Sequence, residues 1–272
     1  MIKSKQFDFC LLIPCYNNLE GLLNSLATVF YYPDRFMVLV VDDGSKIPVT
    51  PASIRSGIKI EFPVFVLRNE RNQGITDALN CGLKWIVERD VANYVARLDC
   101  GDMCATDRFF KQMGFMHDHP DVGLIGSWCI FEDASRTFRY PYKTPTGHSQ
   151  IKRAMHFRNV FIHPTVIFDT RLLKKVGYYP TNFLHAEDYA LFYKLIKITK
   201  SHIVGEFLVT CEINDAGISG KNRQEQLISR ARIVMRFGTS PFLKILGILR
   251  VYILRLLPKK LLLRLRKLQN EQ

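Results

Sequence analysis

The sequence lacks the cysteine spacings that define several common classes of protein. Its seven cysteines are an odd number, and no two of them form a Cys-x-x-Cys pair. The sequence therefore offers neither a zinc-site spacing nor a disulfide framework. We interpret the cysteines as small buried thiols, which are typical of a compartment that keeps thiols reduced, and we expect a cytoplasmic protein.

Acidic residues are scarce relative to basic ones. The 272 residues include 38 Lys and Arg against 25 Asp and Glu, which gives a net charge of +13. An excess of this size points to an anionic partner or surface. Nearly half of the residues (47%) are hydrophobic, which excludes a disordered basic chain. An apolar segment follows Met1-Ile-Lys-Ser-Lys-Gln6 directly, so we expect neither an Arg-rich presequence nor a cleaved signal.

The positive charge is concentrated in the last segment of the sequence. Residues 241–272 carry eight Lys or Arg and one acidic residue, a net charge of +7. The apolar stretch 241–257 is short and is interrupted by three cations, so we do not expect it to span a bilayer. Beyond Pro258, basic residues and leucines would lie on opposite faces of a helix, as in helices that lie in a membrane interface. The alternative is a helix that packs its leucines against the rest of the protein.

The place of this charge disfavours a nucleic-acid-binding role. Proteins that bind single strands present Arg and Lys on a face with interleaved aromatic residues. Here much of the charge lies on an apolar segment instead. We therefore predict no nucleic-acid partner, and we expect the C-terminal segment to attach the protein to an anionic membrane surface.

The most informative segment is an apolar run that ends in two carboxylates. Residues 36–42 are mostly apolar and β-branched, which predicts a strand buried on both faces, as in a parallel sheet. Asp42, Asp43, Gly44 and Ser45 lie at its carboxyl end. Open α/β sheets bind ligands outside this end of their strands, where a carboxylate can accept hydrogen bonds from a nucleobase or a ribose. A solvated Asx-turn is the alternative for a single Asp-Gly pair.

Two further segments repeat the arrangement, which favours a site over a solvated turn. The apolar strand 9–13 is stopped by Pro14 and followed by the pair Tyr16-Asn17, and the strand 93–98 is followed by Asp99 and Asp102. Because the carboxyl ends of parallel strands meet at one edge of a sheet, these groups should form one polar rim. We predict a functional site there.

The ordered set of motifs resembles the signature series of family 2 glycosyltransferases, which carry the GT-A fold. The motifs are Pro14-Cys-Tyr-Asn-Asn18, Val41-Asp-Asp-Gly-Ser45, Asn72-Gln-Gly74 with Asn80 and Gly82, Leu98-Asp-Cys-Gly-Asp102 and Ala186-Glu-Asp-Tyr189. The resemblance covers residues 8–215 and is strongest to bacterial enzymes of O-antigen, capsule and exopolysaccharide synthesis.

The pattern of alternating strands and helices predicts an α/β fold, with a mostly parallel sheet flanked by helices. We expect one GT-A domain over residues 1–220 and a basic, amphipathic helical segment over residues 221–272. The expected strands are 9–13, 36–42, 63–67, 93–98, 122–131 and 203–210. The expected helices are 19–30, 75–89, 106–118, 148–157, 170–176 and 186–199.

The resemblance implies a nucleotide-sugar donor bound at the polar rim. Asp43 matches the family position that accepts a hydrogen bond from the base, which we expect to be uracil. The implied nucleotide-binding residues are Pro14, Tyr16, Asp43, Asn72, Gly74 and Asp99.

The resemblance also implies a divalent cation that neutralises the leaving diphosphate. Asp99 and Asp102 are the expected ligands, because Mg²⁺ and Mn²⁺ prefer carboxylate oxygens. The family pattern is Asp-x-Asp-Asp, and Gly101 stands where the direct metal ligand usually lies. Leu79 stands where the family often has Arg, which removes one diphosphate contact. These departures leave the metal ligands open: Asp102 can bind directly, Asp99 can bind through water, or metal dependence can be weak.

Asp188 is implied as the general base that deprotonates the acceptor hydroxyl. It follows Glu187 at the start of an apolar helix, so a helix-capping acid is the alternative interpretation. Glu187 and His163 are implied contacts of the donor or the acceptor, although a buried structural histidine is equally consistent with Phe161-Ile-His-Pro-Thr165.

Processive members of the family carry Gln-x-x-Arg-Trp after the catalytic Asp, and this sequence has no Trp after Trp128. We therefore expect an inverting, non-processive enzyme that adds one sugar to a lipid-diphosphate-linked oligosaccharide. We expect it on the inner face of the plasma membrane. The alternative is a catalytically silent subunit that binds nucleotide-sugars within a polysaccharide-assembly complex.

Overall fold

The structure is a computed structural model that describes residues 7–133, 135–213 and 222–257. The strands are β1 (Phe7–Cys15), β2 (Phe36–Asp42), β3 (Val64–Arg68), β4 (Ala92–Arg97), β5 (Met103–Cys104), β6 (Val122–Asp133), β7 (Arg139–Tyr142), β8 (Ile167–Asp169) and β9 (Lys200–Ile213). The helices are α1 (Leu19–Leu26), α2 (Pro51–Gly57), α3 (Ile75–Arg89), α4 (Arg108–Asp118), α5 (His148–Ala154), the 3₁₀ turn η1 (His163–Thr165), α6 (Thr170–Val176), α7 (Glu187–Leu195), α9 (Arg223–Phe237) and α10 (Pro241–Leu256).

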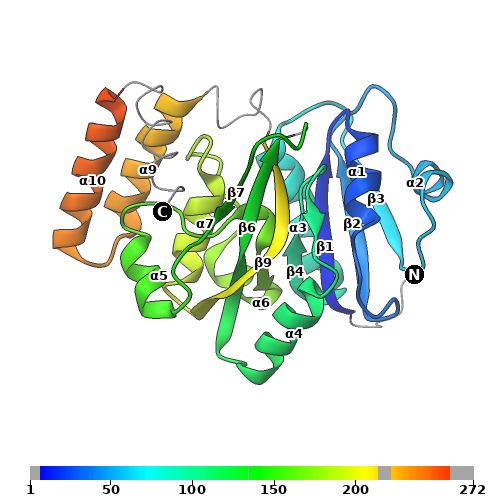
Figure 1. The fold of residues 1–272 in the computed structure, drawn as a ribbon, viewed down its shortest axis with the longest axis horizontal. Coiled ribbons are helices and arrows are strands. Elements are labelled where there is room, and N and C mark those ends of the chain that lie inside the picture. Colours follow the sequence, from blue (N-terminus) through cyan, green and yellow to red (C-terminus); the bar gives the residue numbers. More distant parts are fainter. Residues whose placement is uncertain (1–6, 134, 214–221, 258–272) are drawn as a thin grey trace.

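One curled sheet forms the centre of the molecule (Figure 1), with the strand order β3-β2-β1-β4-β8-β6-β9-β5. The pairs β3–β2, β2–β1, β1–β4 and β6–β9 are parallel, whereas β8 is antiparallel to both β4 and β6. The predicted α/β architecture with a mostly parallel sheet is confirmed. The short strands β5 and β8 were not predicted, because two or three residues are too few to show an alternating pattern.

The strands form because their side chains are buried on both faces. Every residue of β2 is buried, as expected of a central parallel strand. In β1, Phe9, Leu11 and Ile13 pack on one face of the sheet, and Cys10 and Leu12 pack on the other. Helices α1, α2 and α4 cover the first face, and α3, α5, α6 and α7 cover the second. This double cover leaves the strand ends as the place where polar groups can gather.

The C-terminal helices α9 and α10 lie side by side at one end of the molecule (Figure 1). Helix α9 packs on α7, and Ile233 and Val234 join the main core. Gly247 lets α10 approach closely, because a Cβ there would lie 2.0 Å from the carbonyl oxygen of His156. The His156 ring accepts hydrogen bonds from the N–H groups of Thr239 and Ser240, which lead into α10.

The predicted C-terminal helical segment thus contains α9 and α10, and part of α10 packs on the rest of the protein. Among the described residues, no helix combines the length and apolarity needed to cross a bilayer. The basic and leucine-rich residues beyond Leu257, on which the interfacial helix was predicted, lie outside the described part of the chain.

Candidate functional site

The structure brings the predicted strand ends to one edge of the sheet. Cys15 at the end of β1 pairs with Asp42 at the end of β2, and Asp42 pairs with Arg68 at the end of β3. On the other side of β1, Leu12 pairs with Arg97 at the end of β4. The turns that follow these strands therefore lie next to one another, as the sequence predicted.

Asp42 holds the turn after β2 together. Its carboxylate is fully buried and accepts hydrogen bonds from the N–H of Ser45 (2.9 Å) and Val49 (3.1 Å), and it pairs with Arg68. Burial by itself would raise the pKa of Asp42, but these hydrogen bonds outweigh it and the pKa lies below its usual value. Asp42 is thus the structural acid of this pair.

The predicted base-recognition residue, Asp43, organises the loop that carries Asn72 and Gly74. Its carboxylate accepts from Asn69 Nδ2 at 2.7 Å, from the Gln73 N–H at 3.1 Å and from the Gly74 N–H at 2.8 Å. A base N–H would share these oxygens with the loop. The structure therefore places Asp43, Asn72 and Gly74 in one unit, with Gly74 at the start of α3.

Only glycine fits at position 44 of this unit. Gly44 has a φ of +72°, and a Cβ there would lie 2.4 Å from the backbone carbon of Arg71. Gly44 therefore lets the turn after β2 contact the 69–74 loop directly.

Tyr16 lies at the mouth of the same rim. Its side chain is 49% exposed, whereas Pro14 is half-buried at the end of β1. Asn17 fixes the loop, because its N–H donates to Ser45 Oγ (2.8 Å) and its Oδ1 accepts from the Lys46 N–H (2.8 Å). An exposed ring on a tethered loop can stack on a base.

Asp99 is held by a buried arginine that the sequence analysis did not single out. Arg97 is fully buried, forms an ion pair with Asp99 and donates to the carbonyl oxygens of Leu12 and Leu98. The signal was present in the sequence, because an arginine two residues before Asp99 interrupts an otherwise apolar strand. A buried arginine requires a partner, and Asp99 is that partner.

His163 links Arg97 to Tyr179. Its Nε2 lies 3.4 Å from Arg97 Nε and 2.8 Å from the Tyr179 hydroxyl. Because Arg97 can only donate, His163 Nε2 accepts, and the proton of the neutral ring is on Nδ1. Burial, and then the positive charge of Arg97, lower the pKa of His163 to about 3. His163 is therefore neutral at pH 7 and does not act as a cation toward phosphate.

The family asparagine at position 80 positions Tyr179. Asn80 Nδ2 donates to the Tyr179 carbonyl oxygen, and Asn80 Oδ1 accepts from the Tyr179 N–H, both at 2.9 Å. Leu79 beside it is fully buried in the core. Leu79, which replaces the arginine common in the family, therefore serves as a packing residue of the core.

The turn from Asp99 to Asp102 is anchored on α1. Ser25 Oγ donates to the Asp99 carbonyl oxygen (3.2 Å) and accepts from the Gly101 N–H (2.9 Å). Asp102 is buried, and its Oδ1 accepts from the Glu212 N–H at 2.8 Å. Burial, and then the charge of Asp99, raise the pKa of Asp102 well above its usual value.

Glu187 and Asp188, at the start of α7, form a second group of carboxyl groups, which lies close enough to Asp99 to be affected by its charge. Burial, and then the negative charge of Asp188, raise the pKa of Glu187 to about 7. Burial is also the main cause of the raised pKa of Asp188, and the charge of Asp99 adds to both shifts. Asn159, which the sequence analysis missed, donates to Asp188 Oδ2 at 2.9 Å. The N-cap of α7 is Ala186, and the Asp188 carboxylate accepts the Tyr189 N–H at 2.6 Å.

The carboxylates of the site do not by themselves form a complete set of metal ligands in the described part of the chain. Within residues 7–133, 135–213 and 222–257, no three Asp, Glu, His or Cys side chains are arranged as a metal site. Magnesium bound with a diphosphate needs only one or two protein carboxylates, so Asp99 and its neighbours fit that smaller requirement.

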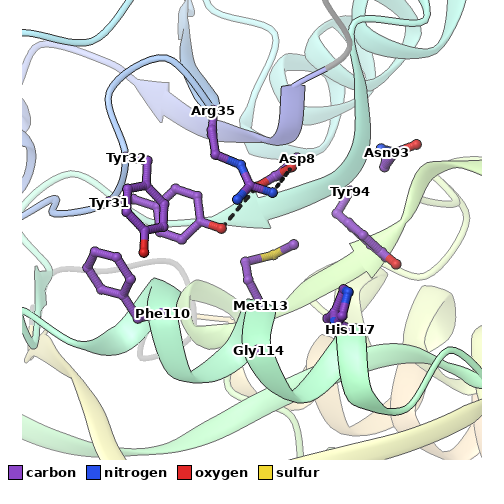
Figure 2. Close-up of a pocket in the computed structure, with 10 residues that line it drawn as sticks. All are labelled: Asp8, Tyr31, Tyr32, Arg35, Asn93, Tyr94, Phe110, Met113, Gly114 and His117. Carbon is purple, nitrogen blue, oxygen red and sulfur yellow. Dashed lines mark hydrogen bonds and ion pairs between the residues drawn. The ribbon is translucent and has the colours of Figure 1, made fainter.

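A separate pocket of about 520 Å³ lies at the opposite ends of β1 and β4 (Figure 2). Asp8 there pairs with Arg35 and accepts from the Tyr31 hydroxyl, beside Tyr94 and Phe110. None of the predicted site residues lines this pocket. The predicted chemistry thus lies at the other edge of the sheet.

Comparison with known proteins agrees with the geometry. A family model described as Glycosyl transferase family 2 matches residues 10–177. The amylovoran biosynthesis glycosyltransferase AmsE of Erwinia amylovora is 32% identical over 197 residues, which are 70% of this chain and 70% of AmsE. The UDP-Gal:alpha-D-GlcNAc-diphosphoundecaprenol beta-1,3-galactosyltransferase of Escherichia coli is 31% identical over 178 residues, 65% of this chain and 61% of that protein.

Solved structures share the fold. S. aureus TarS 1-349 in complex with UDP-GlcNAc superposes with a TM-score of 0.66 at 18% identity, over 89% of this chain and 70% of TarS 1-349. The mannosyltransferase PcManGT of Pyrobaculum calidifontis, in complex with GDP-Man and Mn²⁺, gives 0.66 at 19% identity, over 93% of this chain and 71% of its own. The predicted GT-A fold is confirmed.

Proposed function

Because this chain belongs to glycosyltransferase family 2, we propose that it transfers one sugar from a nucleotide-diphosphate donor to a hydroxyl of a lipid-diphosphate-linked oligosaccharide. We propose UDP as the nucleotide and surface-polysaccharide synthesis as the setting. The names of the relatives support both choices, since one is an amylovoran biosynthesis enzyme and another uses UDP-Gal on a diphosphoundecaprenol-linked sugar.

The observation that carries the proposal is the position of the Glu187–Asp188 pair. These carboxyl groups open α7 close enough to Asp99 for its charge to raise the pKa of both. A general base works best when its pKa is near the working pH, and the pKa of Asp188 is raised toward that range, beside Glu187 with a pKa of about 7. Asp188 would take the proton of the acceptor hydroxyl as that oxygen attacks the anomeric carbon. A single in-line displacement of this kind inverts the configuration.

The donor would lie along the rim of strand ends. Asp43 and the 69–74 loop would bind the base, with Tyr16 stacking on it, and Asp99 would lie on the diphosphate side. Pro14, Asn72 and Gly74 complete the wall of this pocket in the proposal. The absence of Gln-x-x-Arg-Trp after Asp188 favours one addition followed by release.

The residues present fit a divalent cation. Asp99 and Asp102 are the carboxylates predicted to hold it, and at Gly101 the space for a Cβ is taken by another carboxylate oxygen, that of Glu212, at 2.6 Å. When bound, Mg²⁺ or Mn²⁺ neutralises charge on the leaving diphosphate. The protein must hold these carboxylates in position, and the ion pair with Arg97 holds Asp99.

The direct test is a transfer assay with the full-length protein. UDP-, GDP- and dTDP-sugars would be offered with a polyprenyl-diphosphate-linked sugar acceptor, and the product linkage would be read by NMR. We expect one donor to be used and one sugar to be added, with inverted anomeric configuration. Retention of configuration would contradict the role of Asp188 as a base. Repeated addition would contradict release after one transfer.

Gly101 favours one alternative, a catalytically silent subunit that binds nucleotide-sugars. The same assay separates the two functions. A silent subunit would bind UDP-sugar in calorimetry and give no product with any acceptor in the panel.

Helix α10 supports attachment to the inner face of the plasma membrane. One side of α10, with the buried residues Gly247 and Val251, faces the rest of the protein, and α10 packs on α9. The opposite side exposes large apolar residues at intervals of three or four, namely Phe242, Ile245, Leu249, Tyr252, Ile253 and Leu256. The net charge of +7 over residues 241–272 complements an anionic leaflet, where each basic residue contributes about 1 kcal/mol.

Vesicle co-sedimentation tests this attachment. The variant Ile245→Ser/Leu249→Ser/Ile253→Ser changes only exposed side chains. It should lose binding to phosphatidylglycerol vesicles while keeping its thermal stability. Ile47→Ser is the matched control, because Ile47 is 80% exposed and lies outside α10. Equal binding by the triple variant, or loss of a dimer in place of vesicle binding, would contradict attachment through this face.

A further inference from the structure

Gly101 leaves a gap in the acidic motif, and a side chain from a distant strand fills it. A Cβ on Gly101 would lie 2.6 Å from Glu212 Oε2 and 3.4 Å from Glu212 Cδ. The φ of Gly101 is +102°, a value that side-chain-bearing residues rarely adopt. The carboxylate of Glu212 therefore lies where the first atoms of an Asp side chain at position 101 would otherwise begin.

The register of the sheet places Glu212 there. Met103 pairs with Thr210 and Cys104 with Val209 in the antiparallel β5–β9 ladder. Extending this register by two residues brings Gly101 opposite Glu212, and side chains directly opposite each other in such a pair are neighbours. The position is thus set by backbone pairing and not by one flexible side chain.

Asp102 fixes the end of β9 at this point. Its buried Oδ1 accepts from the Glu212 N–H at 2.8 Å, so the backbone that carries Glu212 is tied to the acidic turn. The side chain of Glu212 itself is exposed. An exposed carboxylate on a fixed backbone can reach a ligand arriving from solvent, whereas buried Asp102 acts through its hold on β9.

We propose that Glu212 supplies the metal-binding carboxylate that Gly101 lacks, so that Asp99 and Glu212 together form the protein part of the cation site at the donor diphosphate. Asp102 is then a positioning residue for Glu212. Two carboxylates plus phosphate oxygens satisfy Mg²⁺ or Mn²⁺, which are seldom held by protein ligands alone. This inference rests on the proposed nucleotide-sugar transfer.

The test measures Mn²⁺ binding instead of turnover. Electron paramagnetic resonance of free Mn²⁺ would give the Mn²⁺ affinity of the full chain in the presence of saturating UDP. Glu212→Gln should weaken Mn²⁺ binding about tenfold or more, because losing even an outer-shell partner typically costs 10–100-fold. UDP binding in EDTA, measured by calorimetry, should stay unchanged in this variant.

Glu206→Gln is the matched control, because Glu206 is an exposed glutamate on the same strand and pairs with Lys111. It should bind Mn²⁺ as the wild type does. An unchanged Mn²⁺ affinity in Glu212→Gln would overturn the inference and leave the proposed function standing. Failure of the wild type to bind any nucleoside diphosphate, with or without Mn²⁺, would overturn the proposed function and this inference with it.

Discussion

The two groups of carboxylates in this protein are held in opposite ways. At the ends of β1 and β2, Asp42 and Asp43 are surrounded by N–H donors, five of which come from the backbone or side chains of neighbouring loops. After β4 and at the start of α7, burial raises the pKa of Asp102, Glu187 and Asp188, and the negative charge of Asp99 adds to each of these shifts. Hydrogen bonds hold the carboxylates of the first group, whereas the pKa values of the second group are raised.

This difference distinguishes the carboxylates suited to binding the base from those suited to the transfer reaction. A carboxylate that accepts several N–H groups is stabilised as an anion and is a rigid part of a binding surface. Carboxyl groups that repel one another gain from a cation or from taking up a proton. On this contrast we propose that the loops after β1 and β2 bind the base, and that the turn after β4 and the start of α7 serve the diphosphate and the acceptor.

The largest expected effect is a loss of kcat on substitution of Asp188, which belongs to the second group. Asp188→Asn should lower kcat by about 10²–10⁴-fold, because the acceptor hydroxyl loses its base. The Kd for UDP, measured by calorimetry, should not change, since Asp188 lies outside the base-binding loops. If Asp188→Asn kept the wild-type kcat, Asp188 would not be the general base of the reaction.

A change in the first group should affect binding and stability instead. Asp43→Ala removes the acceptor of the Asn69, Gln73 and Gly74 hydrogen bonds. We expect the Kd for UDP to rise about 10–100-fold, and the free energy of unfolding to fall by about 1–3 kcal/mol. Calorimetry and urea unfolding measure the two effects. If kcat at saturating donor fell as far as in Asp188→Asn, the division between the groups would be wrong.

The pH dependence of transfer should follow the second group. Because the base Asp188 must be deprotonated, the rate should rise with pH through the raised pKa values of the coupled Glu187–Asp188 pair and level off above them. Glu187→Gln removes the repulsion on Asp188, so the midpoint of the profile should move to lower pH. A profile that is flat from pH 5 to 8 in the wild type would contradict the raised pKa values.

The smallest expected effect is a loss of stability when hydrogen bonds that support the second group are removed. Asn80→Ala removes both hydrogen bonds to the backbone of Tyr179, whose hydroxyl contacts His163. We expect a loss of about 1–2 kcal/mol in the free energy of unfolding and a lower melting temperature. Lys84→Ala, an exposed change on the same helix, is the control. Equal stabilities of the two variants would show that Asn80 does not support this part of the site.

The sequence was sufficient to name the carboxylates of both groups, but it did not reveal the contacts that hold the second group. Apolar runs that end in Asp-Gly or Pro-x-Tyr-Asn give both the strands and the edge at which they end, and the structure confirms the alternation. The motif order also led to the family. These signals are local, and the residues that create them lie within a few positions of one another.

The second group depends on contacts that no local pattern carries. Glu212 meets Gly101 through a two-residue ladder between β5 and β9, more than one hundred positions apart. Asn159 reaches Asp188 from a loop, and His163 joins Arg97 to Tyr179. Of the residues that the sequence analysis did not name, only Arg97 had a visible signal, a charge within a buried strand. A single sequence does not reveal which residues far apart in the chain contact each other in the fold.

The most direct test of one donor site shared by both groups is anomalous diffraction from crystals of the full chain with UDP and Mn²⁺. The account predicts a Mn²⁺ peak within coordination distance of Asp99 and Glu212, with the uracil on the Asp43 side. A Mn²⁺ peak that contacts neither residue, or a nucleotide in the pocket beside Asp8 and Arg35, would contradict it.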